Sequence, residues 1–371
     1  MAPGKDDRLS SEREAAKRAF LSANGLGDAR REPLAGDAST RAYERLHRPG
    51  KAPLIFMDQP PSIETAPCPP SASPDERRAL GYNALARLAA GRVDAFIASA
   101  GYLRARGLSA PQIQAADAPL GLAVLEDLGD GLYARLVEAG AAEAPLYEAA
   151  IDVLLQLHQE SPPDVLSADG SSWPLLSYDE LALRTGLDMF IEWWPKYAGT
   201  EPFAADAVDQ WEAIWAPIRA RGAAGASVFC HRDYHAENLI WLPARRGAAR
   251  VGLLDFQDAL RAHPAWDLLS LLQDARRDVP PALESAMLER YLTARPDLDR
   301  ETFLADYAGL AALNAARIVF IFARQVAFFK RPRYRDLLPR VWATLERDIA
   351  APNMAPIKAW FDDHVPVPSR R

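Results

Sequence analysis

Cysteine and lysine are scarce in this sequence. The 371 residues include two cysteines, Cys68 and Cys230, and six lysines beside 37 arginines. Two cysteines can form at most one disulfide, so a chain of this length depends on its apolar core, and we expect free thiols. The few lysines also make any mechanism that needs a lysine easy to check, position by position.

Long hydrophobic runs are missing as well. The most apolar stretch, residues 318–329, is interrupted by Arg324 and Gln325, far short of the ~20 apolar residues of a membrane-spanning helix. The N-terminal segment is charged and lacks the apolar stretch of a secretory signal. A net charge of −7 argues against general nucleic-acid binding. We therefore expect a cytoplasmic monomer that binds neither membranes nor nucleic acids.

The pattern of short and long segments predicts two lobes. A length of 371 residues is well above the ~150-residue prior for one domain. Short β-like runs come first and long helical stretches later, which favours an α+β, bilobal arrangement with a small N-terminal lobe (1–126) and a larger, mostly helical lobe (127–371). Strands are expected at residues 31–34, 42–46, 54–57, 122–125, 227–230 and 251–254, and helices at 11–24, 76–89, 93–106, 146–158 and over most of 265–350. Residues 59–75 carry six prolines and predict an exposed loop.

The richest polar cluster reads HRDYHAEN and covers residues 231–238. Apolar runs on both sides predict a strand–loop–strand unit, and Asp255 follows another apolar run 17 residues after Asn238. Phosphoryl transfer needs a carboxylate near the attacking hydroxyl and oxygen ligands for Mg²⁺. An Asp and an Asn five residues apart, followed by a second Asp at a strand end, have the spacing of the kinase catalytic and metal-binding arrangement.

Other interpretations of this cluster remain open. His231 and His235 are four residues apart, so a zinc pair on a helix is conceivable, although the flanking runs favour a loop. Asp255 could cap a turn. Arg232 has a natural ionic partner in Asp267, which is otherwise a carboxylate at a helix start. We expect His231 to be structural.

Three motifs in the same order resemble the aminoglycoside phosphotransferase and choline-kinase group of small-molecule kinases. They are HRDYHAENLIW (231–241), LLDFQDAL (253–260) and HPAWDLLSLL (263–272), and the segments LLQLH (154–158) and VLEDLGD (124–130) fit the same group. The resemblance covers about residues 30–350 and implies a protein-kinase-like fold with ATP between the lobes. It implies that Asp233 is the catalytic base, that Asn238 and Asp255 hold Mg²⁺, and that the backbone around Glu126 and Leu128 meets the adenine.

A narrower resemblance lies in the first lobe. The segments GDASTR (36–41), FMDQPP (56–61) and EDLGD (126–130) are similar to the bacterial N-acetylmuramate/N-acetylglucosamine anomeric kinases of peptidoglycan recycling. This resemblance implies ATP-dependent phosphorylation of the sugar 1-hydroxyl. It also implies that residues 36–41 form a turn that covers the ATP phosphates, with Gly36, Asp37, Ser39, Thr40 and Arg41 at the nucleotide.

The sequence departs from kinases at one position. Kinases couple a lysine on the third strand to the phosphates and to a glutamate on the next helix. Here Met57 stands at the lysine position, Lys51 lies before the strand, and helix 93–106 has no glutamate. Either Mg²⁺ and the 36–41 turn neutralise the phosphates, or the chain is a non-catalytic kinase relative that binds a partner. The intact Asp–Asn–Asp set favours an active enzyme.

The acceptor site has weaker signals. Asn314, Arg317 and Arg324 lie on one stripe of an otherwise apolar helix at 307–329. This stripe suits an acceptor pocket or an internal salt bridge to Asp267 or to a loop carboxylate. Trp194 and Lys196 offer a stacking face and a cation, or merely cover the core.

Two more features bear on the acceptor. His235, two residues after Asp233, is a further candidate for contact with the sugar. For a lactyl carboxylate, the candidates are Lys196, Arg317 and Arg324. Aminoglycosides, choline and homoserine remain alternative acceptors, although an aminoglycoside would need many carboxylates around it.

Overall fold

The structure is a computed structural model that describes residues 5–34, 41–60 and 66–370. Its strands are β1 (Arg30–Pro33), β2 (Ala42–Arg48), β3 (Lys51–Asp58), β4 (Ile113–Asp117), β5 (Leu122–Glu126), β6 (Val165–Ala168), β7 (Ser171–Pro174), β8 (Val228–Cys230), β9 (Leu239–Trp241), β10 (Val251–Leu253) and β11 (Leu260–Ala262).

The α-helices are α1 (Lys5–Ala23), α2 (Pro74–Leu80), α3 (Tyr82–Leu85), α4 (Val93–Ala105), α5 (Tyr133–Glu138), α6 (Glu143–Leu157), α7 (Glu180–Ala198), α8 (Ala205–Ala224), α9 (Ala265–Leu272), α10 (Pro281–Thr293), α11 (Arg300–Ala327), α12 (Leu338–Asp348) and α13 (Ala355–His364). Short 3₁₀ turns are η1 (Ala236–Asn238), η2 (Gly247–Arg250), η3 (Pro332–Leu337), η4 (Pro352–Met354) and η5 (Val367–Arg370).

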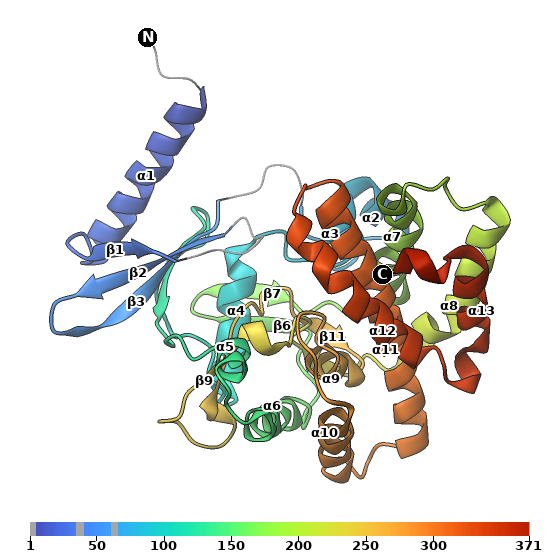
Figure 1. Cartoon of the computed structure of the whole chain (residues 1–371). Coiled ribbons are helices and arrows are strands. Elements are labelled where there is room, and N and C mark those ends of the chain that lie inside the picture. The colour runs from blue at the N-terminus through green and yellow to red at the C-terminus, as the bar shows by residue number, and fades with distance from the viewer. Residues whose placement is uncertain (1–4, 35–40, 61–65, 371) are drawn as a thin grey trace.

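The N-terminal part is built on an antiparallel sheet with the strand order β1-β2-β3-β5-β4. Alternation along β3 sends its side chains to two faces. Phe56 packs with Phe20 of α1 in a small core on one face, whereas Met57 belongs to the main core on the other. Figure 1 shows α1 lying against the sheet and projecting beyond it. We call the α1 side the outer face and the Met57 side the inner face.

Charged side chains attach α1 to the outer face. The Nζ of Lys17 lies 2.8 Å from Glu44 and 3.3 Å from Asp58, and Arg13 pairs with the same Asp58. Arg31 donates to Glu44 as well. Hydrogen bonds from Arg31 and Lys17 outweigh the cost of burial and lower the pKa of Glu44 to about 2. The outer face is therefore a network in which each carboxylate faces cations.

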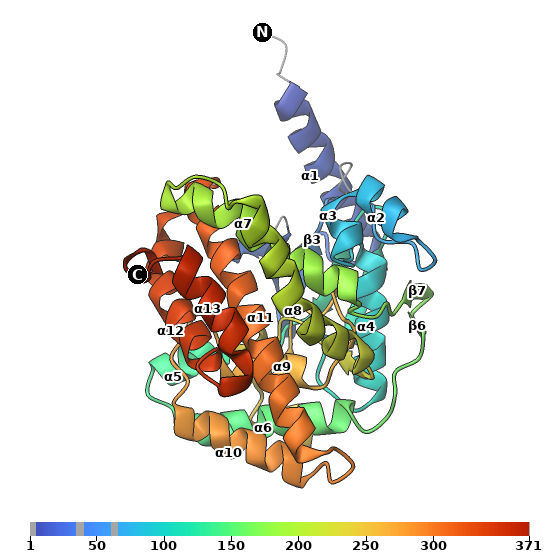
Figure 2. The same ribbon diagram turned by 90° about the vertical axis from the view of Figure 1, so that its right-hand side faces the viewer.

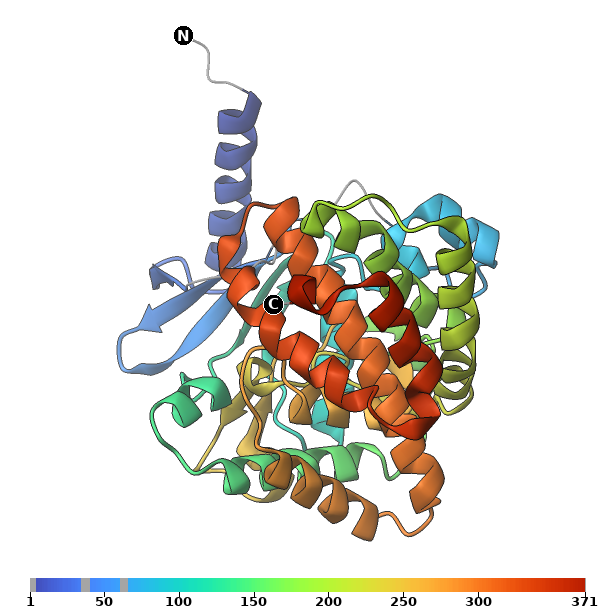
Figure 3. The ribbon, with the colours of Figure 1, turned by 45° about the vertical axis from the view of Figure 1, so that its right-hand side comes forward.

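The C-terminal part is a helical body around α11. Helix α11 packs against α7, α8, α9 and α12, and Figure 2 shows these helices grouped in the body of the molecule, with α1 projecting beyond it at the top. Helices α6 and α10 lie side by side along its lower edge (Figure 3). By length and composition α11 is the one helix of the described residues that could cross a membrane, but 67% of the apolar window that qualifies it is buried inside the protein.

The predicted α+β fold, with a small β-containing lobe and a mostly helical second part, is confirmed. The segment predicted as one helix at 76–89 instead forms the short helices α2 and α3, because Gly81 between them adopts a φ of +90°, which ends a helix. The short strands β4, β6, β7 and β11 were not predicted, since runs of three to five residues carry little periodicity.

The lobe boundary after residue 126 stays a prediction. Strand β5 ends at Glu126, in agreement with the expected position. However, Arg77 of α2 pairs with Asp179, the N-cap residue of α7, so a segment that precedes the boundary is bound to the helical body. Residues 66–73 of the proline-rich stretch contain no helix or strand, and residues 61–65 lie outside the described residues.

Candidate active site

The loop 231–238 joins β8 to β9, as the strand–loop–strand prediction requires. We call it the catalytic loop. Asp267 of α9 holds its first half, since the carboxylate accepts the backbone N–H groups of His231 at 2.7 Å and Arg232 at 2.9 Å. The thiol of Cys230 donates to the same carboxylate at 3.2 Å. Burial raises the pKa of Asp267, although these hydrogen bonds favour its charged form. Asp267 thus fixes where the loop leaves the strand.

The predicted ion pair between Arg232 and Asp267 is wrong. Arg232 adopts a φ of +80°, and its guanidinium points away from Asp267 to donate to the carbonyl oxygens of Ala86 and Arg87. Tyr178 offers its ring to the same guanidinium, with 5.1 Å to the ring centroid. Because the carboxylate of Asp267 is occupied by backbone N–H groups, Arg232 instead anchors the loop to the segment after α3.

The two loop histidines do not form a metal pair. His231 is fully buried, with its ring against Tyr234 and Phe256, as expected for a structural residue. His235 instead lies beside Asn238 and Arg276. The segment is a loop and not a helix, and the described part of the chain holds no group of three or more His, Cys, Asp or Glu residues that could bind a metal ion. The zinc interpretation is therefore unsupported. Both cysteines are free, as predicted, and both are buried.

Backbone hydrogen bonds bring the predicted metal ligands together. The side-chain amide of Asn238 donates to the carbonyl oxygen of Asp233 at 2.8 Å, which closes the catalytic loop. Strands β9 and β10 pair next to it, and the N–H of Leu254 donates to the carbonyl oxygen of Asn238 at 3.0 Å. Asp255, the next residue, therefore lies beside Asn238, and its φ of +61° is a strained conformation of the kind found at functional sites.

The donor atoms suit a hard divalent cation. The side-chain nitrogen of Asn238 is used within the loop. The side-chain oxygen of Asn238 has no hydrogen bond among the described residues. Burial opposes ionisation of Asp255, but the charge of Arg41 and hydrogen bonds from Gln257 and Arg41 outweigh it and lower its pKa. An amide oxygen and an ionised carboxylate are ligands that Mg²⁺ accepts.

The predicted nucleotide-binding residues are partly described. Gly36, Asp37, Ser39 and Thr40 lie outside the described residues, whereas Arg41 is placed next to Asp255. The carboxylate of Glu126 is bound to Arg245, and its backbone N–H donates to the carbonyl oxygen of Gln112 at 2.8 Å. The predicted contact of adenine with the backbone around Glu126 and Leu128 stays a prediction.

The segment after β5 is tied to the sheet. Arg45 of β2 donates to Asp127 at 2.6 Å and to Asp130 at 2.7 Å. Leu128 is 8% exposed and packs on β10 near Gly252. This segment connects the sheet to the helical body and is held at both of its sides.

A cavity opens at the catalytic loop and encloses about 530 Å³, counted out to its solvent-open side. We call it the acceptor cavity. It is lined by Arg232, Asp233, His235, Ser270, Gln273, Asp274, Ala275, Arg276, Asn314, Arg317, Ile318, Ile321 and Phe322. Four predicted site residues, Asp233, His235, Asn314 and Arg317, are therefore brought together from two distant parts of the sequence.

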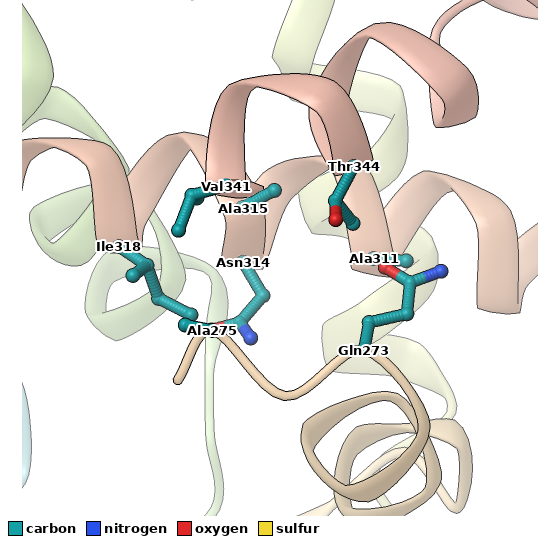
Figure 4. A pocket seen from close by; sticks show the side chains of 8 residues that line it. All are labelled: Gln273, Ala275, Ala311, Asn314, Ala315, Ile318, Val341 and Thr344. Carbon is teal, nitrogen blue, oxygen red and sulfur yellow. The ribbon is translucent and has the colours of Figure 1, made fainter. Parts of the chain in front are cut away.

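A smaller pit adjoins the cavity. It shares Gln273, Ala275, Asn314 and Ile318 with the cavity and adds Ala311, Ala315, Val341 and Thr344. Figure 4 shows the side chains of Asn314 and Gln273 reaching into the space between α11 and the segment after α9, among small apolar side chains. The pit is thus lined by apolar side chains together with the two amides and the hydroxyl of Thr344.

Arg317 faces the acceptor cavity with a neutral partner. Its Nη1 donates to the Oδ1 of Asn314 at 3.1 Å, and no ion pair joins it to a carboxylate of the described residues. The predicted alternative, a salt bridge to Asp267, is wrong, because Asp267 is occupied by the catalytic loop. The stem of Arg317 packs against Gly186 of α7, where a Cβ would lie 3.2 Å from its Cδ.

The other predicted acceptor residues do not line the cavity. Trp194 is 2% exposed and stacks on Phe190 in an aromatic core. Lys196 is exposed and pairs with Glu192 at 2.7 Å. Arg324 lies over the ring of Trp193, 5.2 Å from its centroid. Of the three polar residues predicted on one stripe of α11, Asn314 and Arg317 line the cavity, whereas Arg324 lies among aromatic rings.

Among the cavity residues missed from the sequence are three polar ones that lie together, Gln273, Asp274 and Arg276. They follow directly on the apolar helix α9, so a run of polar residues at a helix end was the available signal. Arg276 pairs with Glu237 of the catalytic loop at 2.9 Å and lies 3.3 Å from the Nε2 of His235. Burial, followed by the charge of Arg276, lowers the pKa of His235, which keeps its ring neutral near pH 7.

The chain matches known proteins along most of its length. Residues 30–304 match the phosphotransferase enzyme family. Over 363 residues, 98% of this chain and 99% of the relative, it is 68% identical to an N-acetylmuramate/N-acetylglucosamine kinase of Caulobacter vibrioides. It is 28% identical to a kinase of the same name from Pseudomonas aeruginosa over 327 residues, 86% of this chain and 83% of the relative.

The fold is similar to that of solved kinases. A crystal structure of a choline/ethanolamine kinase family protein from Mesorhizobium loti aligns with a TM-score of 0.53 and 14% identity, covering 94% of this chain and 98% of that chain. This likeness supports the kinase-like bilobal fold. Together with the matched family and the 68% identical relative, it confirms the sequence-based prediction of an ATP-dependent kinase of the aminoglycoside phosphotransferase and choline-kinase type. The chain belongs to the phosphotransferase enzyme family.

Proposed function

We propose that this enzyme transfers the γ-phosphoryl group of ATP to the anomeric hydroxyl of N-acetylmuramate and N-acetylglucosamine. The observation that carries the proposal is the acceptor cavity, in which Asp233 of the catalytic loop and the polar stripe of α11 face the same space. The names of the Caulobacter vibrioides and Pseudomonas aeruginosa relatives support these two sugars as acceptors.

Asp233 has the position of a catalytic base. Its carboxylate lines the acceptor cavity and makes no hydrogen bond within the described residues, while its backbone oxygen is held by Asn238. An acceptor hydroxyl in the cavity would donate to this carboxylate, which takes the proton as the oxygen attacks phosphorus.

Asn238 and Asp255 would hold Mg²⁺ against the phosphates of ATP. Bound there, the ion would neutralise phosphate charge as the phosphoryl group transfers. The protein would supply two oxygen ligands, and phosphate and water oxygens would complete the shell, as Mg²⁺ prefers. The hydrogen bond from Leu254 to Asn238 keeps the two ligands adjacent before any nucleotide arrives.

The cavity fits the substituents of the two sugars. The guanidinium of Arg317 has only a neutral protein partner and would bind the lactyl carboxylate of N-acetylmuramate. The amides of Asn314 and Gln273, which line both the cavity and the adjoining pit, suit the amide of an acetamido group. His235, which is neutral, would contact the sugar near the reacting hydroxyl.

The same lining argues against polycationic acceptors. The cavity offers two carboxylates, Asp233 and Asp274, and one oxygen of Asp274 already accepts the backbone N–H of Arg276. The cavity also carries the cation of Arg317. An aminoglycoside carries several ammonium groups that need acidic partners. Since both proposed sugars are units of peptidoglycan, the reaction would serve cell-wall recycling in the cytoplasm, where ATP is available.

Turnover with a small panel of acceptors tests the proposal. The protein, ATP and Mg²⁺ are incubated with N-acetylmuramate, N-acetylglucosamine, choline, homoserine and an aminoglycoside, and ADP release is followed. The matched control is the methyl 1-glycoside of N-acetylglucosamine, which has every group of the substrate except the anomeric hydroxyl.

We expect ADP with the two free sugars and background hydrolysis with the methyl glycoside. Equal ADP release with the methyl glycoside would contradict phosphorylation at the anomeric position. No ADP with any acceptor would favour the alternative of a non-catalytic protein.

A further inference from the structure

The inner face of the sheet lacks the usual lysine of kinases. Met57 of β3 stands at the lysine position and is 1% exposed. It lies opposite Tyr43 of β2 and Ala123 of β5. Residues directly opposite each other in antiparallel strands point to the same face. The inner face at this point is therefore formed by Met57, Tyr43 and Ala123, with no cation among them.

The described lysines that precede the catalytic loop do not reach this place. Lys17 is bound on the outer face to Glu44 and Asp58. Lys51 is exposed at the start of β3, and Lys196 pairs with Glu192 on the surface of the helical body. None of these three lysines supplies a positive charge at the inner face.

Arg41 supplies that charge from the neighbouring strand. It comes immediately before β2 and two residues before Tyr43, a spacing that keeps side chains on one face of an extended strand. Its Nη1 lies 3.3 Å from the hydroxyl of Tyr43, which confirms that the side chain follows the inner face. The side chain of Arg41 is only 13% exposed.

The guanidinium of Arg41 bridges the sheet to the segment after β10. Its Nη1 donates to the Oε1 of Gln257 at 2.6 Å, and its Nη2 donates to the Oδ1 of Asp255. The Nε2 of Gln257 also donates to Asp255 at 3.0 Å. One oxygen of Asp255 is therefore held by two donors, and its other oxygen has no hydrogen bond among the described residues.

We propose that Arg41 replaces the strand-3 lysine of kinases, holding Asp255 in place and adding positive charge where the ATP phosphates bind. This inference rests on the proposed function, because it assumes that Asp255 faces a bound Mg²⁺–ATP complex. Arg41 acts through Asp255 and is a positioning residue.

Helix α4 lacks the glutamate that kinases pair with their lysine, and the position of Arg41 accounts for this absence. A lysine ammonium at the end of a flexible chain needs a separate partner to keep it in position. The planar fork of an arginine binds two acceptors at once, here Asp255 and Gln257. Helix α4 carries Asp94 as its acid, and that residue pairs with Arg92 instead. With Gln257 as the second acceptor, no glutamate from α4 is required.

A set of variants tests the inference. Arg41→Gln removes the charge, Arg41→Lys keeps it, and the double variant Arg41→Gln/Met57→Lys moves it to the usual strand. Arg30→Gln is the control, because Arg30 lies on β1 of the same sheet and is 65% exposed. For each protein, the binding of Mg²⁺–AMPPNP without sugar, the Mg²⁺ dependence of kcat, the KM for N-acetylglucosamine and the melting temperature are measured.

For Arg41→Gln we expect kcat to fall about 100-fold, because a charged group at the transferring phosphates is lost. We also expect the half-saturating Mg²⁺ concentration to rise several-fold, whereas the sugar KM and the melting temperature stay near wild type. Arg41→Lys and the double variant should recover at least a tenfold part of the lost kcat. Arg30→Gln should match the wild type in every measurement.

Three results would overturn the inference. They are an unchanged kcat and Mg²⁺ dependence in Arg41→Gln, a loss of kcat explained by a lowered melting temperature, and no recovery in either lysine-bearing variant. Failure of the proposed function gives a different result, since the wild type would then bind Mg²⁺–AMPPNP with a strong dependence on Arg41 and still phosphorylate neither sugar.

Discussion

The two faces of the N-terminal sheet hold similar charged side chains in different arrangements. On the outer face, the carboxylates of Glu44 and Asp58 are surrounded by cations from α1 and β1, including Lys17. On the inner face, Arg41 reaches out of the sheet to Asp255, a residue more than 200 positions away. The outer network joins neighbours within one part of the molecule, and the inner contact joins the two parts.

The difference separates structural charges from charges available to a ligand. The outer network leaves no carboxylate without a cation, so it stabilises the docking of α1 and has little capacity to bind anything else. In the acceptor cavity, by contrast, the carboxylate of Asp233 and the guanidinium of Arg317 have no charged protein partner among the described residues. Unpartnered charged groups that line a cavity are candidates for binding and catalysis.

The largest expected difference is between an aspartate of the acceptor cavity, Asp233, and an aspartate of the outer face, Asp58. Asp233→Asn should lower kcat about 1,000-fold with an unchanged melting temperature, because the proton acceptor is lost while the backbone contacts of the loop remain. Asp58→Asn should leave kcat within about twofold and lower the free energy of unfolding by about 1–3 kcal/mol, because Lys17 and Arg13 lose a partly buried counter-charge. Steady-state kinetics and urea unfolding of both variants check this. Retained activity in Asp233→Asn would contradict its assignment as base.

A lysine at the usual kinase position should harm this protein. Met57→Lys places an ammonium in the core of the inner face, with Arg41 on the same face and no free carboxylate of the described residues opposite it in the sheet. We expect the free energy of unfolding to drop by about 3 kcal/mol and kcat not to rise. Thermal unfolding and ADP release measure the two effects. A large gain in activity would mean that the inner face lacks a cation that the reaction needs.

Two arginines on α11 sharpen the same distinction. Arg317→Gln should reduce kcat/KM for N-acetylmuramate about 10- to 100-fold, the effect of losing a charge-assisted hydrogen bond, and change N-acetylglucosamine less than threefold. Arg324→Gln is the matched control seven residues away, and we expect neither sugar to be affected, because Arg324 lies among aromatic rings. Equal losses for both sugars in Arg317→Gln would exclude Arg317 as the carboxylate partner.

The stabilisation that the outer face provides should depend on pH. The folded protein holds the pKa of Glu44 near 2, below its value of about 4.5 in an unfolded chain, so its stabilising effect is present above pH 4.5 and disappears as the pH falls toward 2. Glu44→Gln should therefore be less stable than the wild type by about 1 kcal/mol at pH 7, after allowance for solvent screening, and the difference should shrink below pH 4.5. Urea unfolding at pH 7 and pH 3 measures it. A difference that grows in acid would contradict this sign.

Local spacing made part of the site predictable. Asp233, Asn238 and Asp255 are set by a short loop and by the strand pair that follows it, so their order in the sequence already places them together. The stripe of Asn314 and Arg317 was also readable, because helical periodicity puts them on one face.

Contacts between distant segments were not predictable. Periodicity does not say which neighbour a stripe meets, so Arg324 and Trp194 were expected in a pocket and lie among aromatic side chains instead. Arg232 was expected to pair with a carboxylate, and it binds carbonyl oxygens of a segment about 145 residues earlier. The reach of Arg41 to Asp255 likewise depends on how the sheet sits against the helical body.

The position of the phosphate on the product tests the central claim most directly. Phosphorus-31 NMR of the product formed from ATP and N-acetylglucosamine should show one phosphate resonance that couples to the single anomeric proton. The signal should disappear on mild acid treatment, since a phosphate at the anomeric carbon is labile. An acid-stable phosphate coupled to the two protons of the primary hydroxymethyl group would contradict anomeric transfer.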